Sequence, residues 1–207
     1  MRHLNQRSEM LSGISHDLRT PLTRIKLQLT FIKDKIISKK LSDDVIEMEK
    51  MLTEYLQFSS LQSTKETETF DISDLLKSTV KKYEKKEITI DTTDRVYFHG
   101  KKNLIRRCFN NLIDNAIKYS NNIAIQLNKT ANNITITIDD DGPGIPLDER
   151  KNVFKAFYKI DKSRGGAKSS VGLGLSIASD TIRSHGGNIK LETSPTNGLR
   201  VKIFLPF

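Results

Sequence analysis

The sequence has few of the features that mark secreted, membrane-spanning or metal-cluster proteins. Its 207 residues include one cysteine, Cys108, which excludes an intramolecular disulfide and a cysteine-cluster metal site and fits a reducing compartment. No apolar run approaches the roughly 18 residues needed to cross a membrane, and no signal peptide opens the chain. The P-loop pattern GxxxxGK(S/T) and the HRD and DFG motifs of protein kinases are also missing. We therefore expect a cytoplasmic protein outside those two classes of phosphate-binding enzyme.

What the chain does contain is enough apolar material for a core and an excess of positive charge. Hydrophobic residues make up 36% and charged residues 29%, and 34 basic against 25 acidic side chains give a formal charge of +9. The length suits one large domain or two small ones. A positive net charge is compatible with a nucleic acid as a partner, but it equally suits any ligand that carries phosphate.

Two long amphipathic helices are predicted over the first domain, residues 1–64. Apolar residues recur in steps of three and four over residues 4–36 and again over 41–56, so each helix has one apolar seam. Ser42 occupies an N-cap position for the second helix, which places the joint near residues 37–42. A hairpin of about 60 residues buries too little surface to stand alone, so two copies are expected to pair into a dimeric four-helix bundle.

The second domain, residues 65–207, alternates helices and strands after a polar linker at residues 63–69. The overall class is therefore α+β, and the hairpin predicted at Lys129–Asn133 makes the sheet at least partly antiparallel, as in an α/β sandwich. The clearest strand is the alternating run Ile134–Ile138. Helices are predicted at 73–86, 101–119 and 172–185, and strands at 88–90, 96–98, 123–127, 134–138, 188–193 and 199–205.

His16 is the first candidate for chemistry. It lies almost opposite the apolar seam, so its imidazole should face solvent, where a pKa near 6.5 leaves it partly neutral and able to act as a nucleophile. Thr20 shares its face at i+4, Asp17 is adjacent, and Pro21 leaves the carbonyl of Asp17 without its helical donor. A lone surface histidine of no consequence is the alternative, but this combination of groups favours a function.

A nucleotide site is the second candidate, assembled from three segments. Asn111, Asn115 and Lys118 recur at i, i+4 and i+7, so one helical face carries two amides suited to Mg²⁺ and an ammonium suited to phosphate. A carboxylate at the end of the strand before Gly142 could accept a hydrogen bond from an adenine amino group. The run 172–175 opens a helix whose free N–H groups would bind phosphate. Taken singly, these segments equally fit a solvated face, an acidic turn and an ordinary helix start.

Residues 157–171 are predicted to form a mobile lid over the ligand, since they combine two adjacent glycines with several serines and lysines. Phe154 and Phe157 precede this segment at i, i+3. They could anchor the lid against the core, or both could simply pack in the core.

Five motifs in order resemble those of sensor histidine kinases. The run His16-Asp17-Leu18-Arg19-Thr20-Pro21 is similar to their phosphoacceptor box, and its continuation to Ile25 is closest to osmosensing kinases of the EnvZ type. The other four resemblances are Asn111 to Tyr119 with the N box, Asp141 to Gly144 with the first glycine box, Phe154 to Phe157 with the F box, and Gly172 to Leu175 with the second glycine box.

The resemblance implies a fold and a set of residue roles. Residues 1–64 would be the dimerisation and histidine phosphotransfer domain, and 65–207 the catalytic ATP-binding domain of the gyrase, Hsp90, histidine kinase and MutL fold. The implied roles are adenine recognition for Asp141, Mg²⁺ binding for Asn111 and Asn115, nucleotide contact for Lys118 and Tyr119, pocket shape for Gly142, Gly144, Gly172, Leu173 and Gly174, acid or base for Asp17, and water positioning for Thr20.

The resemblance also implies an activity and partners. The chain would use ATP and Mg²⁺ to phosphorylate His16, pass the phosphoryl group to an aspartate of a response regulator receiver domain, and also dephosphorylate that regulator. Gyrase-type relatives carry a glutamate where this sequence has Asn111, and an amide cannot take a proton, so slow ATP hydrolysis is expected. We expect a homodimer without nucleic acid as a partner. The family usually has a membrane sensor before the phosphoacceptor box, so this cytoplasmic chain is expected to be either a fragment or a soluble kinase.

The positive charge concentrates near the predicted lid. Residues 1–64 carry ten basic and eight acidic side chains (+2), whereas residues 65–207 carry 24 and 17 (+7). Residues 150–168 contain seven basic side chains against Asp161 alone. We interpret this excess of positive charge as a local electrostatic field that attracts the triphosphate of ATP. Neutralising Arg164 and measuring the affinity for ATP tests this interpretation.

Overall fold

The computed structural model of the chain describes residues 20–59, 67–83, 87–92, 95–160 and 172–206. The chain divides into two compact units, Met1–Lys65 and Glu66–Phe207, which are considered one at a time. Three predicted site residues, His16, Asp17 and Arg164, lie outside the described residues. Within the described part, no helix combines the length and the apolar character that crossing a membrane requires.

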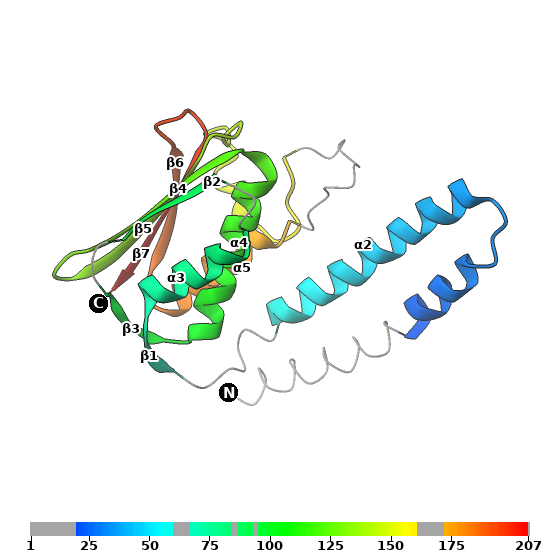
Figure 1. Cartoon of the computed structure of the whole chain (residues 1–207), viewed down its shortest axis with the longest axis horizontal. Helices are drawn as coiled ribbons and strands as arrows, with labels where there is room; N and C mark the ends of the chain where they lie inside the picture. The colour runs from blue at the N-terminus through cyan, green and yellow to red at the C-terminus, as the bar shows by residue number, and fades with distance from the viewer. Residues whose placement is uncertain (1–19, 60–66, 84–86, 93–94, 161–171, 207) are drawn as a thin grey trace. The chain divides into compact units, whose positions relative to one another are not determined.

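The first unit is a helical hairpin. A helix over residues 20–29 is followed by a turn and by α2 (Lys35–Ser59) (Figure 1). Leu29 and Val45 are buried in it. The ammonium of Lys26 lies 2.6 Å from a carboxylate oxygen of Glu49, and the hydroxyl of Ser38 donates to the carbonyl of Leu29 at 2.8 Å, so polar contacts also join the two helices.

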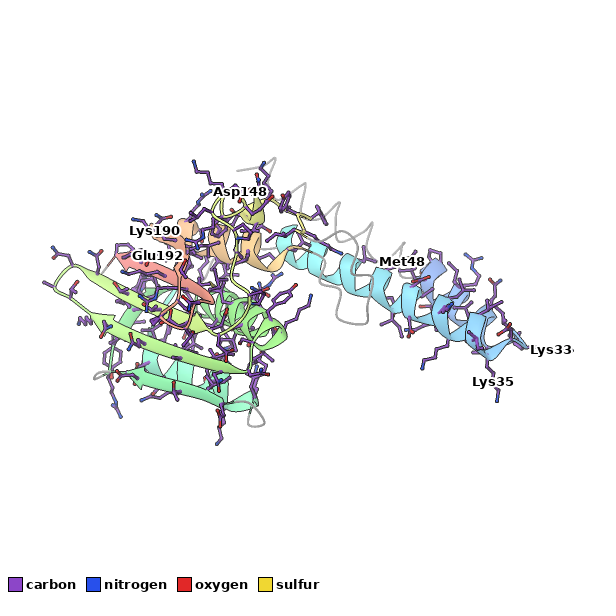
Figure 2. All side chains as sticks on the ribbon, turned by 90° about the horizontal axis from the view of Figure 1, so that it is seen from above. Lys33, Lys35, Met48, Asp148, Lys190 and Glu192 are labelled. Atoms are coloured by element: carbon purple, nitrogen blue, oxygen red, sulfur yellow. The ribbon has the colours of Figure 1, made fainter. Side chains whose placement is uncertain are left out.

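The joint of the hairpin lies earlier than the sequence predicted. The turn covers residues 30–34 and includes Lys33, and Lys35 follows it as the first residue of α2 (Figure 2). Asp34 Oδ1 accepts hydrogen bonds from the backbone N–H groups of Ile36 and Ile37 at 2.9 and 3.1 Å, so Asp34 is the N-cap and Ser42 lies inside α2. The prediction of a joint at 37–42 was wrong because the apolar periodicity continues across the turn, whereas a side-chain cap sets where α2 begins.

The second unit is built on a mixed five-stranded sheet. The strands are β2 (Glu87–Thr92), β4 (Asn122–Lys129), β5 (Asn133–Asp140), β6 (Asn188–Thr193) and β7 (Leu199–Pro206), in the spatial order β2-β4-β5-β7-β6. The predicted hairpin at Lys129–Asn133 joins β4 and β5, which pair antiparallel. Only β2 and β4 pair parallel in this sheet, a feature that the sequence did not reveal.

Helices cover one face of this sheet and form the core with it (Figure 1). They are α3 (Ile72–Val80), which runs into a short 3-10 helix at Lys81–Tyr83, α4 (Lys102–Tyr119) and α5 (Gly174–Ser184). The alternating isoleucines of β5 at 134, 136 and 138 are at most 1% exposed and pack in one cluster with apolar residues of α4 and α5. This arrangement confirms the predicted α/β sandwich.

The other face of the sheet is polar. Arg200 on β7 holds Asp139 on β5 by two hydrogen bonds of 2.7 Å, and Lys190 and Glu192 lie on β6, at the sheet edge (Figure 2). Near the predicted linker, β1 (Glu68–Asp71) pairs antiparallel with β3 (Tyr97–Gly100), so part of the segment assigned to the linker is a strand. Four residues were too few for a periodic signal.

Candidate functional site

The polar face of α4 carries the predicted amides and ammonium. Seven residues of α4 are buried in the core, which turns Asn111, Asn115 and Lys118 toward the opposite side, where all three are half-buried. Asn111 Nδ2 is buried and has no hydrogen-bond partner among the described residues. An amide can rotate by 180° and exchange Nδ2 for Oδ1 with little change of shape, so Asn111 can offer either a donor to phosphate or an oxygen to Mg²⁺.

The N-terminus of α5 lies beside Asn111. A Cβ atom on Gly174 would lie 3.8 Å from Asn111 Cβ and 3.9 Å from its carbonyl oxygen. Leu173 is fully buried and anchors this end, and no side chain among the described residues caps it. The first N–H groups of α5 are therefore oriented to bind an anion next to the amide face of α4.

Gly172 is needed for the backbone that leads into α5. Its φ is +81°, and a Cβ atom there would lie 2.7 Å from the carbonyl oxygen of Tyr158. The carbonyl of Gly172 accepts from the N–H of Phe157 at 3.0 Å, so the two ends of the predicted lid are held together. A side chain at position 172 would both strain the backbone and displace this contact.

Asp140 is the buried carboxylate of the site. It ends β5, is 5% exposed, and its Oδ1 accepts from the N–H groups of Gly142 and Leu199 at 2.9 and 3.0 Å. Burial raises the pKa of this carboxyl, and the two N–H donors partly oppose the rise. No hydrogen bond to Oδ2 occurs within the described part of the chain, so Oδ2 is available to a ligand.

The turn between β6 and β7 holds Asp140 from the other side, and sequence reasoning missed it. The hydroxyls of Ser194 and Thr196 donate to the carbonyl oxygen of Asp140 at 2.7 and 3.0 Å. A Cβ atom on Gly198 would lie 2.1 Å from the same oxygen, so the turn packs directly on it. No local pattern in the sequence links residues that are more than 50 positions apart.

Asp141 has a different environment from the one the resemblance implied. Its Oδ1 accepts from the N–H groups of Asn121 and Asn122 at 2.9 and 3.1 Å, and its Oδ2 accepts from Asn122 Nδ2 at 2.7 Å. These bonds, led by the one from the Asn122 N–H group, lower the pKa of Asp141. Both oxygens are thus engaged by the turn after α4, which makes Asp140 the better placed carboxylate for adenine.

The loop that begins at Asp141 packs against the end of α4. A Cβ atom on Gly142 would lie 2.8 Å from the carbonyl oxygen of Tyr119, and Gly144, with φ of +68°, lies against Gly198. Tyr119 is itself exposed, and the ammonium of Lys118 lies 4.8 Å from the centre of its ring. The structure therefore brings together the residues predicted in α4, in this loop and at the start of α5.

The approach to the lid differs from the prediction in two respects. Phe154 packs against the core, but Phe157 is 56% exposed with φ of +65°, so core packing of both side chains is wrong. Arg150 donates to the carbonyls of Ile145 and Leu191 and to the hydroxyl of Thr193. The guanidinium of Arg150 therefore fixes the loop to β6.

Only one of the three predicted catalytic residues is described. Thr20 is the first described residue of the first unit; it is helical and exposed. Leu27 on the same helix is 61% exposed, and Phe31 in the turn that follows is 84% exposed. The helix α2 of the same chain therefore does not cover these two side chains.

Comparison with known proteins adds two family matches. Residues 100–207 match the family described as "Histidine kinase-, DNA gyrase B-, and HSP90-like ATPase", and residues 6–64 match the "His Kinase A (phospho-acceptor) domain". The second match contains His16 and the first contains every predicted nucleotide-site residue.

Individual relatives align along almost the whole chain. The sensor histidine kinase GtrS of Pseudomonas aeruginosa is 32% identical over 99% of this chain and 43% of its own length, and CpxA of Escherichia coli is 31% identical over 99% and 48%. The chain thus spans about half the length of these curated relatives. The crystal structure of full-length ShkA in complex with AMPPNP has a similar fold, with a TM-score of 0.76 and 21% identity over 97% of this chain and 46% of that one.

Proposed function

Because the chain belongs to the histidine kinase-, DNA gyrase B- and HSP90-like ATPase family, we propose that it is an ATP-dependent protein-histidine kinase of a two-component system. It phosphorylates His16 and passes the phosphoryl group to an aspartate of a response regulator. One observation supports the nucleotide part most directly. Asp140 is buried with one carboxylate oxygen held by the chain's own N–H groups and the other available to a ligand.

Each part of ATP has a matching group in this arrangement. Oδ2 of Asp140 accepts a hydrogen bond from the adenine amino group, and the N-terminal N–H groups of α5 bind phosphate oxygens. Lys118 leaves the ring of Tyr119 to meet the triphosphate, and Tyr119 contacts the nucleotide. Asn111 and Asn115 would hold Mg²⁺ through their amide oxygens, and the ion would neutralise charge on the phosphates.

Phosphoryl transfer then follows from what the site contains. A ring nitrogen of His16 attacks the γ-phosphorus, the bond to the β,γ-bridging oxygen breaks, ADP leaves, and the imidazole proton passes to Asp17. Asn111 stands where hydrolytic relatives have a glutamate, and its amide cannot accept a proton from water. The γ-phosphoryl is thereby preserved for His16 rather than lost to hydrolysis.

The proposed partners follow from the same reaction. The acceptor is the receiver domain of a response regulator, and Thr20 positions water when that regulator is dephosphorylated. Exposed Leu27, on the helix that includes Thr20, and exposed Phe31, in the turn that follows, offer the regulator an apolar contact. Two copies of the hairpin pair into a four-helix bundle. Because ATP is the substrate, we place the domain on the cytoplasmic side.

The direct test is incubation of the chain with γ-labelled ATP and Mg²⁺. We expect label that is labile in acid and stable in base, attached to His16. His16→Gln should abolish labelling and leave nucleotide binding unchanged. Label retained at another residue would contradict the assignment of His16, and steady phosphate release without any labelling would indicate an ATPase instead.

A further inference from the structure

We propose that Asp141 is a positioning residue that holds the end of α4, with Lys118 and Tyr119, against the loop that follows Asp140. This inference rests on the nucleotide site proposed above and adds a residue that does not itself touch the nucleotide. It replaces the direct adenine contact that the resemblance implied for Asp141.

The contacts of Asp141 join two segments that are far apart in the sequence. The bonds to the N–H groups of Asn121 and Asn122 and to Asn122 Nδ2 measure 2.9, 3.1 and 2.7 Å. Asn121 and Asn122 follow α4 by two and three residues, because α4 ends at Tyr119. One carboxylate therefore binds the whole turn between α4 and β4.

The connection held in this way follows directly on the last turn of α4, which must stay in place for nucleotide binding. The loop after Asp141 lies so close to the last residue of α4 that a Cβ atom on Gly142 would be 2.8 Å from the carbonyl oxygen of Tyr119. Lys118 and Tyr119 belong to this final turn of the helix. Helix ends fray unless their polar groups are bound, so loss of the carboxylate releases the turn beside the ligand.

The adjacent carboxylates have separate roles because Asp140 is the last residue of β5 and Asp141 is the first residue after it. Asp140 points into the core side of the sheet and ends β5, whereas Asp141 lies beyond the strand and reaches back toward β4. An asparagine at position 141 would keep an Oδ1 acceptor for both backbone N–H groups, and rotation of the Asn122 amide would let it accept from the new Nδ2. The task of Asp141 therefore requires an acceptor and not a negative charge.

Three variants of the full chain test this inference. Asp141→Ala removes the acceptor, Asp141→Asn keeps it without the charge, and Asp139→Ala is the matched control. Asp139 is a neighbouring carboxylate that binds Arg200 on the open face of the sheet, so its removal changes the net charge equally. The measurements are the Kd for ATP with Mg²⁺, the melting midpoint, and amide hydrogen exchange at Asn121 and Asn122.

We expect Asp141→Ala to weaken ATP binding by about tenfold, at the lower end of the effects that follow loss of hydrogen bonds that orient binding groups. Exchange at Asn121 and Asn122 should accelerate, and the melting midpoint should fall no more than in Asp139→Ala. Asp141→Asn should bind ATP within about twofold of the unaltered chain, since it retains both N–H bonds.

Two results would overturn the inference. The first is unchanged ATP affinity in Asp141→Ala. The second is an equal loss in Asp141→Asn and Asp141→Ala, because that would indicate a direct contact or a charge effect. If the unaltered chain binds no nucleotide, the proposed function fails and the positioning role fails with it. Exchange at the two asparagines then still reports whether Asp141 holds the turn.

Discussion

Replacing Asp140 by asparagine tests the central feature of the nucleotide site. The structure engages one oxygen of this carboxylate with Gly142 and Leu199 and leaves the other for the ligand. An asparagine can keep its Oδ1 on the two N–H groups, which places Nδ2 where Oδ2 was. The adenine amino group would then meet a donor instead of an acceptor.

The size of the effect follows from this single contact. A hydrogen bond to a charged group contributes about 1.5–3 kcal/mol, and a buried donor left without an acceptor costs about 1–3 kcal/mol more. A total of roughly 3 kcal/mol corresponds to about a hundredfold increase in the Kd for ATP. The fold itself should change little, because the bonds that position residue 140 remain.

The same variant should reverse base preference, which separates recognition from general damage. Inosine triphosphate carries an oxygen in place of the adenine amino group, so it presents an acceptor to the new Nδ2. Titration calorimetry of the unaltered chain and Asp140→Asn with both nucleotides provides the measurement, with Asp141→Asn as the matched control. A Kd for ATP within about threefold of the unaltered value in Asp140→Asn would refute the assignment of Asp140 to adenine.

Two further predictions concern stability. Nδ1–H of His185 donates to the Thr181 carbonyl, and Nε2 of the same ring accepts from the Lys101 N–H. Burial lowers the pKa of His185 below its usual 6.5, so the folded state favours the neutral ring. Stability from this group is therefore full above pH 6.5 and falls below it by at most about 1.4 kcal/mol per pH unit. Urea unfolding at pH 5 to 7.5 should show this loss, and an identical pH dependence in His185→Gln would contradict it. Gly198→Ala places a Cβ atom 2.1 Å from the Asp140 carbonyl oxygen and should lower stability by roughly 1–3 kcal/mol. Gly174→Ala, with its nearest contact at 3.8 Å, should not lower the melting midpoint, and an equal fall in both variants would contradict the steric argument.

Much of the fold was predictable because its signals are local. The alternation of residues 134–138 predicted β5, and the spacing of Asn111, Asn115 and Lys118 predicted a shared face on α4, since strand and helix periods act over a few residues. Element boundaries were less predictable. The cap at Asp34 begins α2 earlier than periodicity indicated, because two hydrogen bonds to one side-chain oxygen outweigh a continuing apolar pattern.

The sequence alone determined the order and type of most elements, although not of β1, together with the hairpin of β4 and β5 and the set of motifs that converge on one site. Only the tertiary structure decided which of two adjacent carboxylates is buried with an oxygen available for a ligand. Asp140 is fixed by Leu199, Ser194 and Thr196, and Asp141 by the turn after α4. Adjacent residues have the same local pattern, so their roles depend on partners brought close by the sheet from distant parts of the chain.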